Sequence, residues 1–238
     1  MLRTLYTPRG EQMIGPMSEK PWNVYPRPQM RRDSYVNLNG NWLFRVSDDP
    51  TVPEKAADQQ LPQQYPYGIK VPFCPESVLF DLHMQIQPGS WLFYFYRVQL
   101  PQGFRKDRVL LHLGAVDQIA DIYVNQKELL HHEGGYEAFT VDITDAFTGD
   151  TFDLVIRCYD DLKDQTFPYG KQTLNRGGMW YTPVSGIWQS VWLESVPAEY
   201  IRRLNIENRG ASVTISTEPA LEGTVLLAGQ EHPLVSGS

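Results

Sequence analysis

The chain has 238 residues, and 21 Lys and Arg against 28 Asp and Glu give it a formal net charge of −7. Apolar residues make up 42% of the chain and charged residues 21%, which is typical of a globular protein and excludes a disordered one. The acidic balance, without a stripe of Lys and Arg, argues against a nucleic-acid partner. Because no run of about 20 apolar residues occurs, we also expect no membrane span.

Two cysteines, Cys74 and Cys158, are too few for a disulfide framework. Cys158 ends an alternating apolar run, so we expect it to be a small core residue. The first nine residues lack the apolar stretch of a signal peptide, and the sequence contains no Asn-x-Ser/Thr site for glycosylation. Both observations favour a cytoplasmic location.

Residues 1–37 are rich in Pro and Arg and show little periodicity, which predicts an extended arm packed on the body. Beyond them, apolar side chains recur at every second position in short runs, at residues 109–113, 122–125, 152–158 and 187–194. This period is typical of antiparallel strands with one buried face. Turn signals rich in Gly, Asn and Asp separate the runs, and only isolated helical turns are expected, one of them at Ile143–Phe147. The sequence therefore predicts an all-β chain, a sandwich or jelly roll.

The last strong strand pattern ends before Val196-Pro197-Ala198, where we place a domain boundary. Three further strand-like runs follow, at residues 200–206, 212–216 and 224–227. They amount to about 40 residues, too few for an independent sandwich of roughly 100. We therefore predict a sandwich domain over residues 38–197 and an incomplete second domain over residues 198–238.

No motif of a known catalytic or cofactor site occurs: there is no G-x-S-x-G, H-E-x-x-H, P-loop or G-x-G-x-x-G. The pair His131-His132 does not predict a metal site, because adjacent residues on a strand face opposite ways. The acidic pairs Asp48-Asp49 and Asp160-Asp161 are neighbours in loops, not carboxylates converging from separate strands. We assign no catalytic residue, no metal ligand and no cofactor.

Asp160-Asp161 ends a strongly apolar strand and opens a long loop that interleaves charged and amide side chains with aromatic rings. These are Lys163, Asp164, Lys171, Gln172, Asn175 and Arg176, with Phe167, Tyr169, Trp180 and Tyr181. Aromatic faces beside carboxylates and amides are what a carbohydrate site needs. The alternative is that the tryptophan packs in the core, as most sandwich tryptophans do.

The segment Leu38-Asn39-Gly40-Asn41-Trp42-Leu43-Phe44 resembles the L-[DN]-G-x-W-x-F opening of the sugar-binding domain in glycoside hydrolase family 2, the family of β-galactosidases, β-glucuronidases and β-mannosidases. Further segments are similar to this family in the same order over roughly residues 20–196: Val71–Ser77, Tyr96-Arg97, Val109–Asn125, Gly134–Phe139, Gly170-Lys171-Gln172 and Trp180–Glu194. In place of the family's usual Asn-Gly turn, this chain has Asn125-Gln126.

The resemblance implies a jelly-roll domain, similar to galactose-binding domains, at the start of a longer enzyme. The family places an immunoglobulin-like sandwich next, with which residues 198–238 correspond, and then a (β/α)8 barrel that carries the two catalytic glutamates. We therefore expect a non-catalytic domain that shapes the substrate cleft of a glycoside hydrolase, and no hydrolysis by this chain alone. A stand-alone carbohydrate-binding module and a pure interface element are the alternatives. The identity of the sugar is left open, as is whether the parent enzyme forms a homo-oligomer.

In some members of the family an aspartate after the strand that matches Phe152–Cys158 reaches the mouth of the barrel; here it corresponds to Asp160. Its carboxylate would accept hydrogen bonds from sugar hydroxyls or help to hold a cation. The alternative is that Asp160 caps the strand end and meets only water. With Asp160 we expect Trp180 and Arg176 to be substrate-binding residues.

Overall fold

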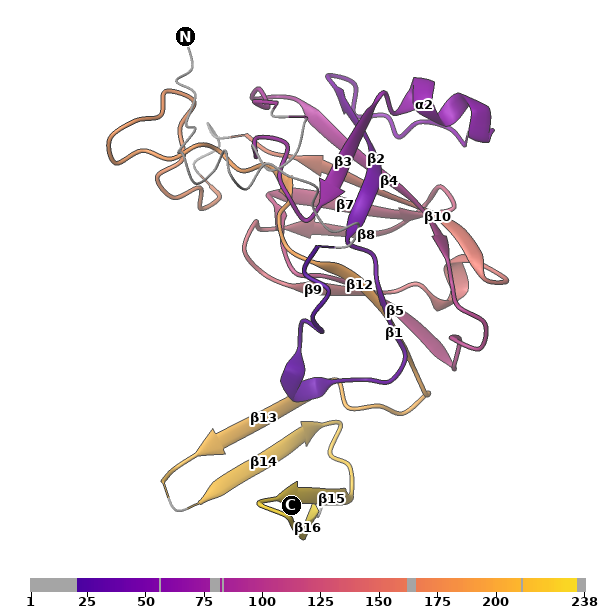
Figure 1. Ribbon diagram of the computed structural model, residues 1–238, viewed down its shortest axis with the longest axis vertical. Helices are drawn as coiled ribbons and strands as arrows, with labels where there is room; N and C mark the ends of the chain where they lie inside the picture. The colour runs from indigo at the N-terminus through magenta and orange to yellow at the C-terminus, as the bar shows by residue number, and fades with distance from the viewer. Residues whose placement is uncertain are drawn as a thin grey trace.

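The computed structural model describes residues 21–55, 57–77, 82, 84–161, 166–210 and 212–234. Within these ranges the chain is built almost entirely of antiparallel strands, which form two facing sheets and two separate hairpins (Figure 1). The all-β sandwich predicted from the sequence is confirmed. Among the described residues, no helix has the length and apolar character needed to cross a membrane.

The larger sheet has six strands in the order β3-β2-β4-β10-β7-β8. Their bounds are β2 (Gly40–Ser47), β3 (Tyr67–Val71), β4 (Trp91–Gln99), β7 (Ile119–Val124), β8 (Lys127–Glu133) and β10 (Thr151–Tyr159). β4 and β10 form the centre and pair over their whole length, from Thr151 opposite Gln99 to Tyr159 opposite Trp91. Asp160, which follows β10 directly, therefore sits at the end of a central strand.

The smaller sheet has the order β1-β12-β5-β9, with β1 (Tyr35–Asn37), β5 (Arg108–Leu113), β9 (Phe139–Asp142) and β12 (Val191–Val196). A separate short ladder pairs β6 (Val116–Asp117), which follows β5 in the sequence, with β11 (Gly186–Ile187), which precedes β12. The 3-10 helix η3 (Thr144–Ala146) is the single turn expected after residue 142. β1 begins at Tyr35, so the last three residues of the predicted arm belong to the sandwich.

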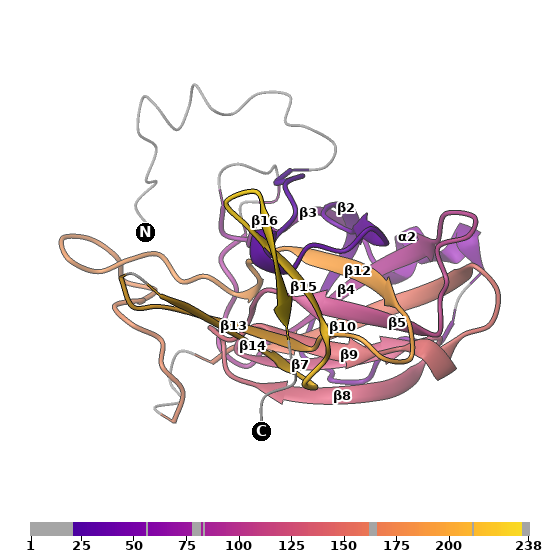
Figure 2. The same cartoon turned by 90° about the horizontal axis from the view of Figure 1, so that it is seen from below.

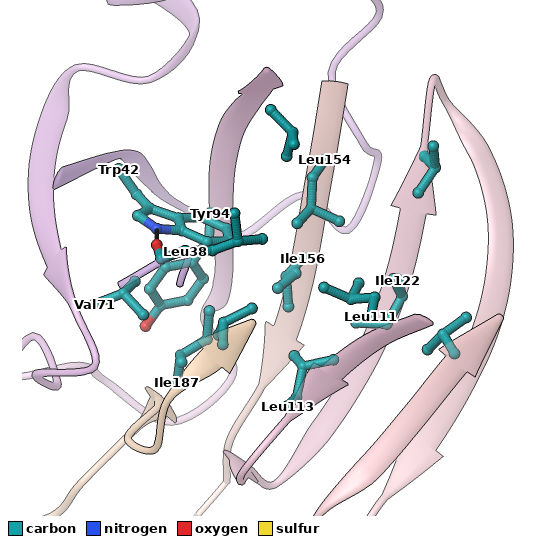
Figure 3. Close-up of a cluster of buried hydrophobic side chains, with 14 of the residues drawn as sticks. Leu38, Trp42, Val71, Tyr94, Leu111, Leu113, Ile122, Leu154, Ile156 and Ile187 are labelled. Atoms are coloured by element: carbon teal, nitrogen blue, oxygen red, sulfur yellow. Dashed lines mark hydrogen bonds between the residues drawn. The ribbon is translucent and has the colours of Figure 1, made fainter. Parts of the chain in front are cut away.

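The core lies between the two sheets, where the alternating apolar side chains of both meet. Figure 3 shows Ile122 and Ile156 of the six-stranded sheet close to Leu111 of the smaller one. Trp42 is 2% exposed, and its indole N–H donates to the backbone oxygen of Leu38 at 2.8 Å. Cys158 is fully buried, as predicted.

Several strands are buried on both faces, which differs from the predicted half-buried pattern. On β5, Leu110 and His112 are buried along with their inward-facing neighbours. The outer face of β4 and β10 is covered by a second apolar cluster, to which the short helix α2 (Leu61–Gln64) contributes Leu61. α2 follows the 3-10 helix η2 (Asp58–Gln60).

The described part of the amino-terminal arm, which includes the 3-10 helix η1 (Pro28–Met30), lies against the outer face of β12. Its side chains converge on Glu194 of β12, which is 0% exposed. Arg27 and Arg32 donate to the Glu194 carboxylate at 2.6 and 2.9 Å. The predicted packing of this arm on the body is therefore seen for residues 21–34; residues 1–20 lie outside the described part.

Beyond the sandwich, β13 (Arg203–Asn208) pairs with β14 (Val213–Glu218), and β15 (Gly223–Leu227) pairs with β16 (Gln230–Leu234). Figure 1 shows these two hairpins outside the facing sheets, and in Figure 2, seen from below, they overlap the sheets in projection. Three of the four strands overlap the strand-like runs predicted after residue 198. The boundary at residue 197 and the immunoglobulin-like character of this part stay predictions.

Candidate functional site

A pocket of about 480 Å³ opens at the loop between β10 and β11. Its walls are Pro88, Tyr169, Gln172, Thr173, Leu174, Asn175 and Trp180. The loop residues 162–165, with Lys163 and Asp164 from the predicted set, lie outside the described part of the chain. The pocket thus combines aromatic rings with side-chain amides and a hydroxyl, a mixture suited to sugar C–H faces and sugar hydroxyls.

The backbone of this loop folds back on itself and so fixes the pocket wall. Thr173 donates its N–H to the oxygen of Tyr181 at 3.0 Å, and Tyr181 donates to Lys171 at 2.9 Å. At the tip, Gly177 and Trp180 exchange backbone hydrogen bonds of 3.3 and 3.2 Å. Gly178 between them has φ of 63°, a left-handed conformation that glycine adopts without strain.

Trp180 is 47% exposed and lines the pocket, so its alternative interpretation as a core residue is wrong. Arg176 lies on the same loop but is not part of the pocket wall, and its guanidinium donates to Oε1 of Gln85 at 2.9 Å. The structure therefore brings Trp180 to the pocket and holds Arg176 against a neighbouring segment.

Asp160 is buried behind the pocket, 5% exposed, so its alternative interpretation as a cap that meets only water is wrong. Its Oδ2 lies 2.8 Å from the hydroxyl of Ser185, which precedes β11. The same hydroxyl lies 2.9 Å from Oε1 of Glu76, and the Ser185 N–H donates to the other Glu76 oxygen at 3.3 Å. Two carboxyls from distant segments therefore meet at one serine.

A third carboxyl, that of Asp117 on β6, lies in the same buried region. It is 4% exposed, its Oδ1 has no hydrogen-bond partner, and the Gln172 side chain hydrogen-bonds to it. Gly135 leaves room for it, because a Cβ there would sit 2.2 Å from Asp117 Oδ1. Since Gln172 also lines the pocket, it connects the pocket wall to the buried carboxyls.

Burial raises the pKa of all three carboxyls, because a charged carboxylate is poorly solvated inside the protein. The pKa of Glu76 rises to about 7 and that of Asp160 to about 6. The pKa of Asp117 rises to about 7, first through burial and then through the nearby charge of Asp160. Neutral and ionised forms of these groups therefore coexist near physiological pH.

No group of three or more His, Cys, Asp or Glu side chains among the described residues could hold a metal ion. His131 and His132 bind different partners: His131 Nδ1 lies 2.6 Å from Asp121, whereas His132 Nε2 lies 3.1 Å from the oxygen of Gly134. This is the opposed arrangement expected for neighbours on a strand.

Sequence reasoning did not single out Glu76, Asp117 or Ser185 as members of the site. Glu76 and Ser185 both stand within segments that carry the family resemblance, so a signal was present for them. Their contact joins positions 109 residues apart, and it depends on the packing of the sandwich. Asp117 also stands in such a segment, Val109–Asn125.

No family model matches the chain. Among curated proteins, the chain is 25% identical over 189 residues to a putative β-glucuronidase of Formosa agariphila, which covers 78% of this chain and 21% of that protein. It is 38% identical over 129 residues to human β-glucuronidase, which covers 51% of this chain and 20% of the relative. A β-galactosidase of Thermoanaerobacter pseudethanolicus is 25% identical over 197 residues, or 79% of this chain and 25% of the relative. These curated relatives of the chain are glycosidases.

The fold is shared with solved glycosidases as well. A Faecalibacterium prausnitzii β-glucuronidase superimposes with a TM-score of 0.61 at 20% identity, over 90% of this chain and 41% of that one. A Ruminococcus gnavus β-glucuronidase gives 0.56 at 17% identity, over 82% and 34%. The resemblance expected from the sequence is confirmed, and the chain spans about a fifth to a quarter of the length of these curated glycosidases.

Proposed function

We propose that the chain is the non-catalytic sandwich domain of a retaining glycosidase of glycoside hydrolase family 2, where it shapes the substrate cleft of a (β/α)8 barrel. The observation that carries the proposal is the pocket of Trp180 and Gln172, which is formed mainly by the loop that follows central strand β10, in a chain with glycosidase relatives. Loops at strand ends are where sandwich domains carry binding residues.

The pocket wall supports carbohydrate as the ligand. The half-exposed indole of Trp180 offers an apolar face for sugar C–H groups, and the amides of Gln172 and Asn175 both donate and accept hydrogen bonds to hydroxyls. Trp180 is the direct contact that we propose. Contacts from Asp160 and Arg176 stay predictions, because neither residue lines the pocket: Asp160 is buried and Arg176 is bound to Gln85.

A stand-alone carbohydrate-binding module is the second candidate, favoured by the fact that the pocket is formed by this chain's own residues. Hydrolysis distinguishes the two functions. We expect this chain to release no p-nitrophenol from p-nitrophenyl β-D-glucuronide or β-D-galactoside, and the natural protein that contains it to be longer and active on one of them. A natural protein that binds sugar but carries no further domain and no activity would support the binding module and refute the glycosidase.

A further inference from the structure

The hydroxyl of Ser185 is placed between two acids, and this arrangement constrains where protons can be. Ser185 Oγ lies 2.9 Å from Glu76 Oε1 and 2.8 Å from Asp160 Oδ2, and all three residues are at most 6% exposed. At such distances each oxygen pair must share a hydrogen atom, since two oxygens without one repel each other.

Ser185 has a single hydroxyl hydrogen, so it can donate to one carboxyl only. The second short contact requires a hydrogen on the other carboxyl, which then donates to the serine oxygen. One of the two acids is therefore neutral in this arrangement. If both were ionised, two buried charges would flank one oxygen, and one contact would be left without a hydrogen.

We assign this hydrogen to Glu76. Its pKa is raised to about 7, above the value of about 6 for Asp160. The ionisable groups around this pair are acidic as well. The charge of Asp161 raises the pKa of Asp160. The charge of Glu76 raises the pKa values of Asp117, Tyr94 and Cys74. Asp161 and Asp117, when ionised, disfavour a second negative charge here, whereas the phenol of Tyr94 and the thiol of Cys74 stay neutral.

A chain of contacts leads from Ser185 to the pocket. The neighbouring residue, Val184, donates its N–H to Oε1 of Gln172 at 2.5 Å. Gln172 lines the pocket and also bonds to Asp117. The position of the segment at Ser185 thus sets the position of Gln172.

We propose that Glu76 is a positioning residue for the pocket: its neutral carboxyl donates to Ser185, Ser185 donates to an ionised Asp160, and the pair anchors the segment that holds Gln172. When Glu76 releases its proton to solvent, the anchor loosens and the pocket loses its shape. This inference rests on the proposed carbohydrate function and makes sugar binding by that site dependent on pH.

The substitution Glu76→Gln tests the proposal, because an amide N–H replaces the acid hydrogen at every pH. Carboxyl ¹³C NMR of the whole chain should show one glutamate that is neutral at pH 6 and absent in Glu76→Gln. The Val184 amide should shift between pH 6 and pH 8 in the original chain and clearly less in the variant, where only Asp117 and Asp160 still titrate in this range. Glu133→Gln, at an exposed glutamate on β8, is the matched control and should behave like the original chain.

Titration with methyl β-D-glucuronide gives the functional readout. With a pKa of about 7, roughly a tenth of Glu76 is protonated at pH 8, so the apparent affinity should fall about tenfold from pH 6 in the original chain. The apparent affinity should fall clearly less in Glu76→Gln and be weak at both pH values in Ser185→Ala. An ionised Glu76 at pH 6, or equal pH dependence with and without Glu76, would overturn the proposal. Absence of sugar binding at both pH values, with a neutral Glu76, would instead refute the carbohydrate function.

Discussion

Glu194 on β12 and Arg32 of the amino-terminal arm form an ion pair at 2.9 Å in which the carboxylate is completely buried. Arg27 donates to the same oxygen at 2.6 Å, and His112 of the neighbouring strand β5 lies 3.2 Å from it. The phenol of Tyr25 donates to the other carboxylate oxygen. The Glu194 side chain therefore holds the arm on the sandwich, and the arm covers the outer face of β12 and β5.

Removing this carboxylate should destabilise the whole chain. In Glu194→Ala the two arginines lose their partner, and breaking a buried pair in this way costs about 3–5 kcal/mol. Urea unfolding measures the change in the free energy of unfolding. Glu218→Ala, at an exposed ion pair with Arg202 and Arg203, is the control and should change it by less than about 1 kcal/mol. A similar small loss for Glu194→Ala would contradict the role of the arm.

Stability should pass through a maximum near pH 4, where two opposing sets of carboxyls balance. The hydrogen bonds from His112, Arg27 and Tyr25 hold the pKa of Glu194 well below its usual range, so its contribution is lost as the pH falls below about 4.5. Glu76, Asp117 and Asp160 act in the opposite direction. Their folded pKa values of about 6 to 7 exceed the unfolded ones of about 4, so stability is lost as the pH rises from about 4 through the folded pKa values.

Part of the loss of stability at rising pH can be assigned to Glu76. For Glu76, a shift from 4.5 to about 7 corresponds to about 3 kcal/mol between pH 4 and pH 8. Urea unfolding at several pH values should show a shallower decline in Glu76→Gln than in the original chain. A stability that rises steadily from pH 5 to pH 8 would show that the buried carboxyls are ionised at no cost.

Trp42, Trp188 and Trp192 should differ in their contribution to the free energy of unfolding. Trp42 and Trp192 are 2% and 4% exposed, so truncation to alanine should cost about 3–5 kcal/mol each. Trp188 is only half-buried and lies outside a strand. Trp188→Ala should cost clearly less, and equal losses in urea unfolding would contradict this ranking.

Gly135→Ala should disturb the buried carboxyls by steric contact. The new Cβ would lie 2.2 Å from Oδ1 and 2.8 Å from Cγ of Asp117, so we expect a loss of about 1–3 kcal/mol in the free energy of unfolding. Gly68→Ala is the matched control, because its Cβ would meet only the oxygen of Trp42 at 4.0 Å. Equal stability of the two variants would show that Asp117 can move away freely.

Local patterns predicted the strands but not what covers them. The alternating runs of β7 and β10 were enough to locate both, because each run buries one face against the core. The run from Ile187 to Leu193 reads as one strand but is broken between β11 and β12, where Asn39 accepts from Val191 and donates to Ser190. Such side-chain hydrogen bonds between distant segments leave no periodic trace.

The candidate site was predictable only where its residues are neighbours in sequence. Trp180 and Gln172 share one loop whose mixture of rings and amides is visible locally. Glu76 and Asp117 meet Ser185 and Asp160 only after both sheets have formed, so no local pattern could bring them together. The covering segment at α2 was missed for a similar reason, since a helix of four residues has no measurable period.

The measurement that tests the central claim most directly is calorimetric titration of this chain with methyl β-D-glucuronide and methyl β-D-galactoside. We expect one of them to bind, and Trp180→Ala to weaken that binding about tenfold or more, because the indole supplies the apolar face of the pocket. Tyr181→Ala, at an exposed neighbouring ring outside the pocket wall, should leave the affinity unchanged. Equal affinities for the original chain and Trp180→Ala, or no binding of either glycoside, would contradict a carbohydrate site in this loop.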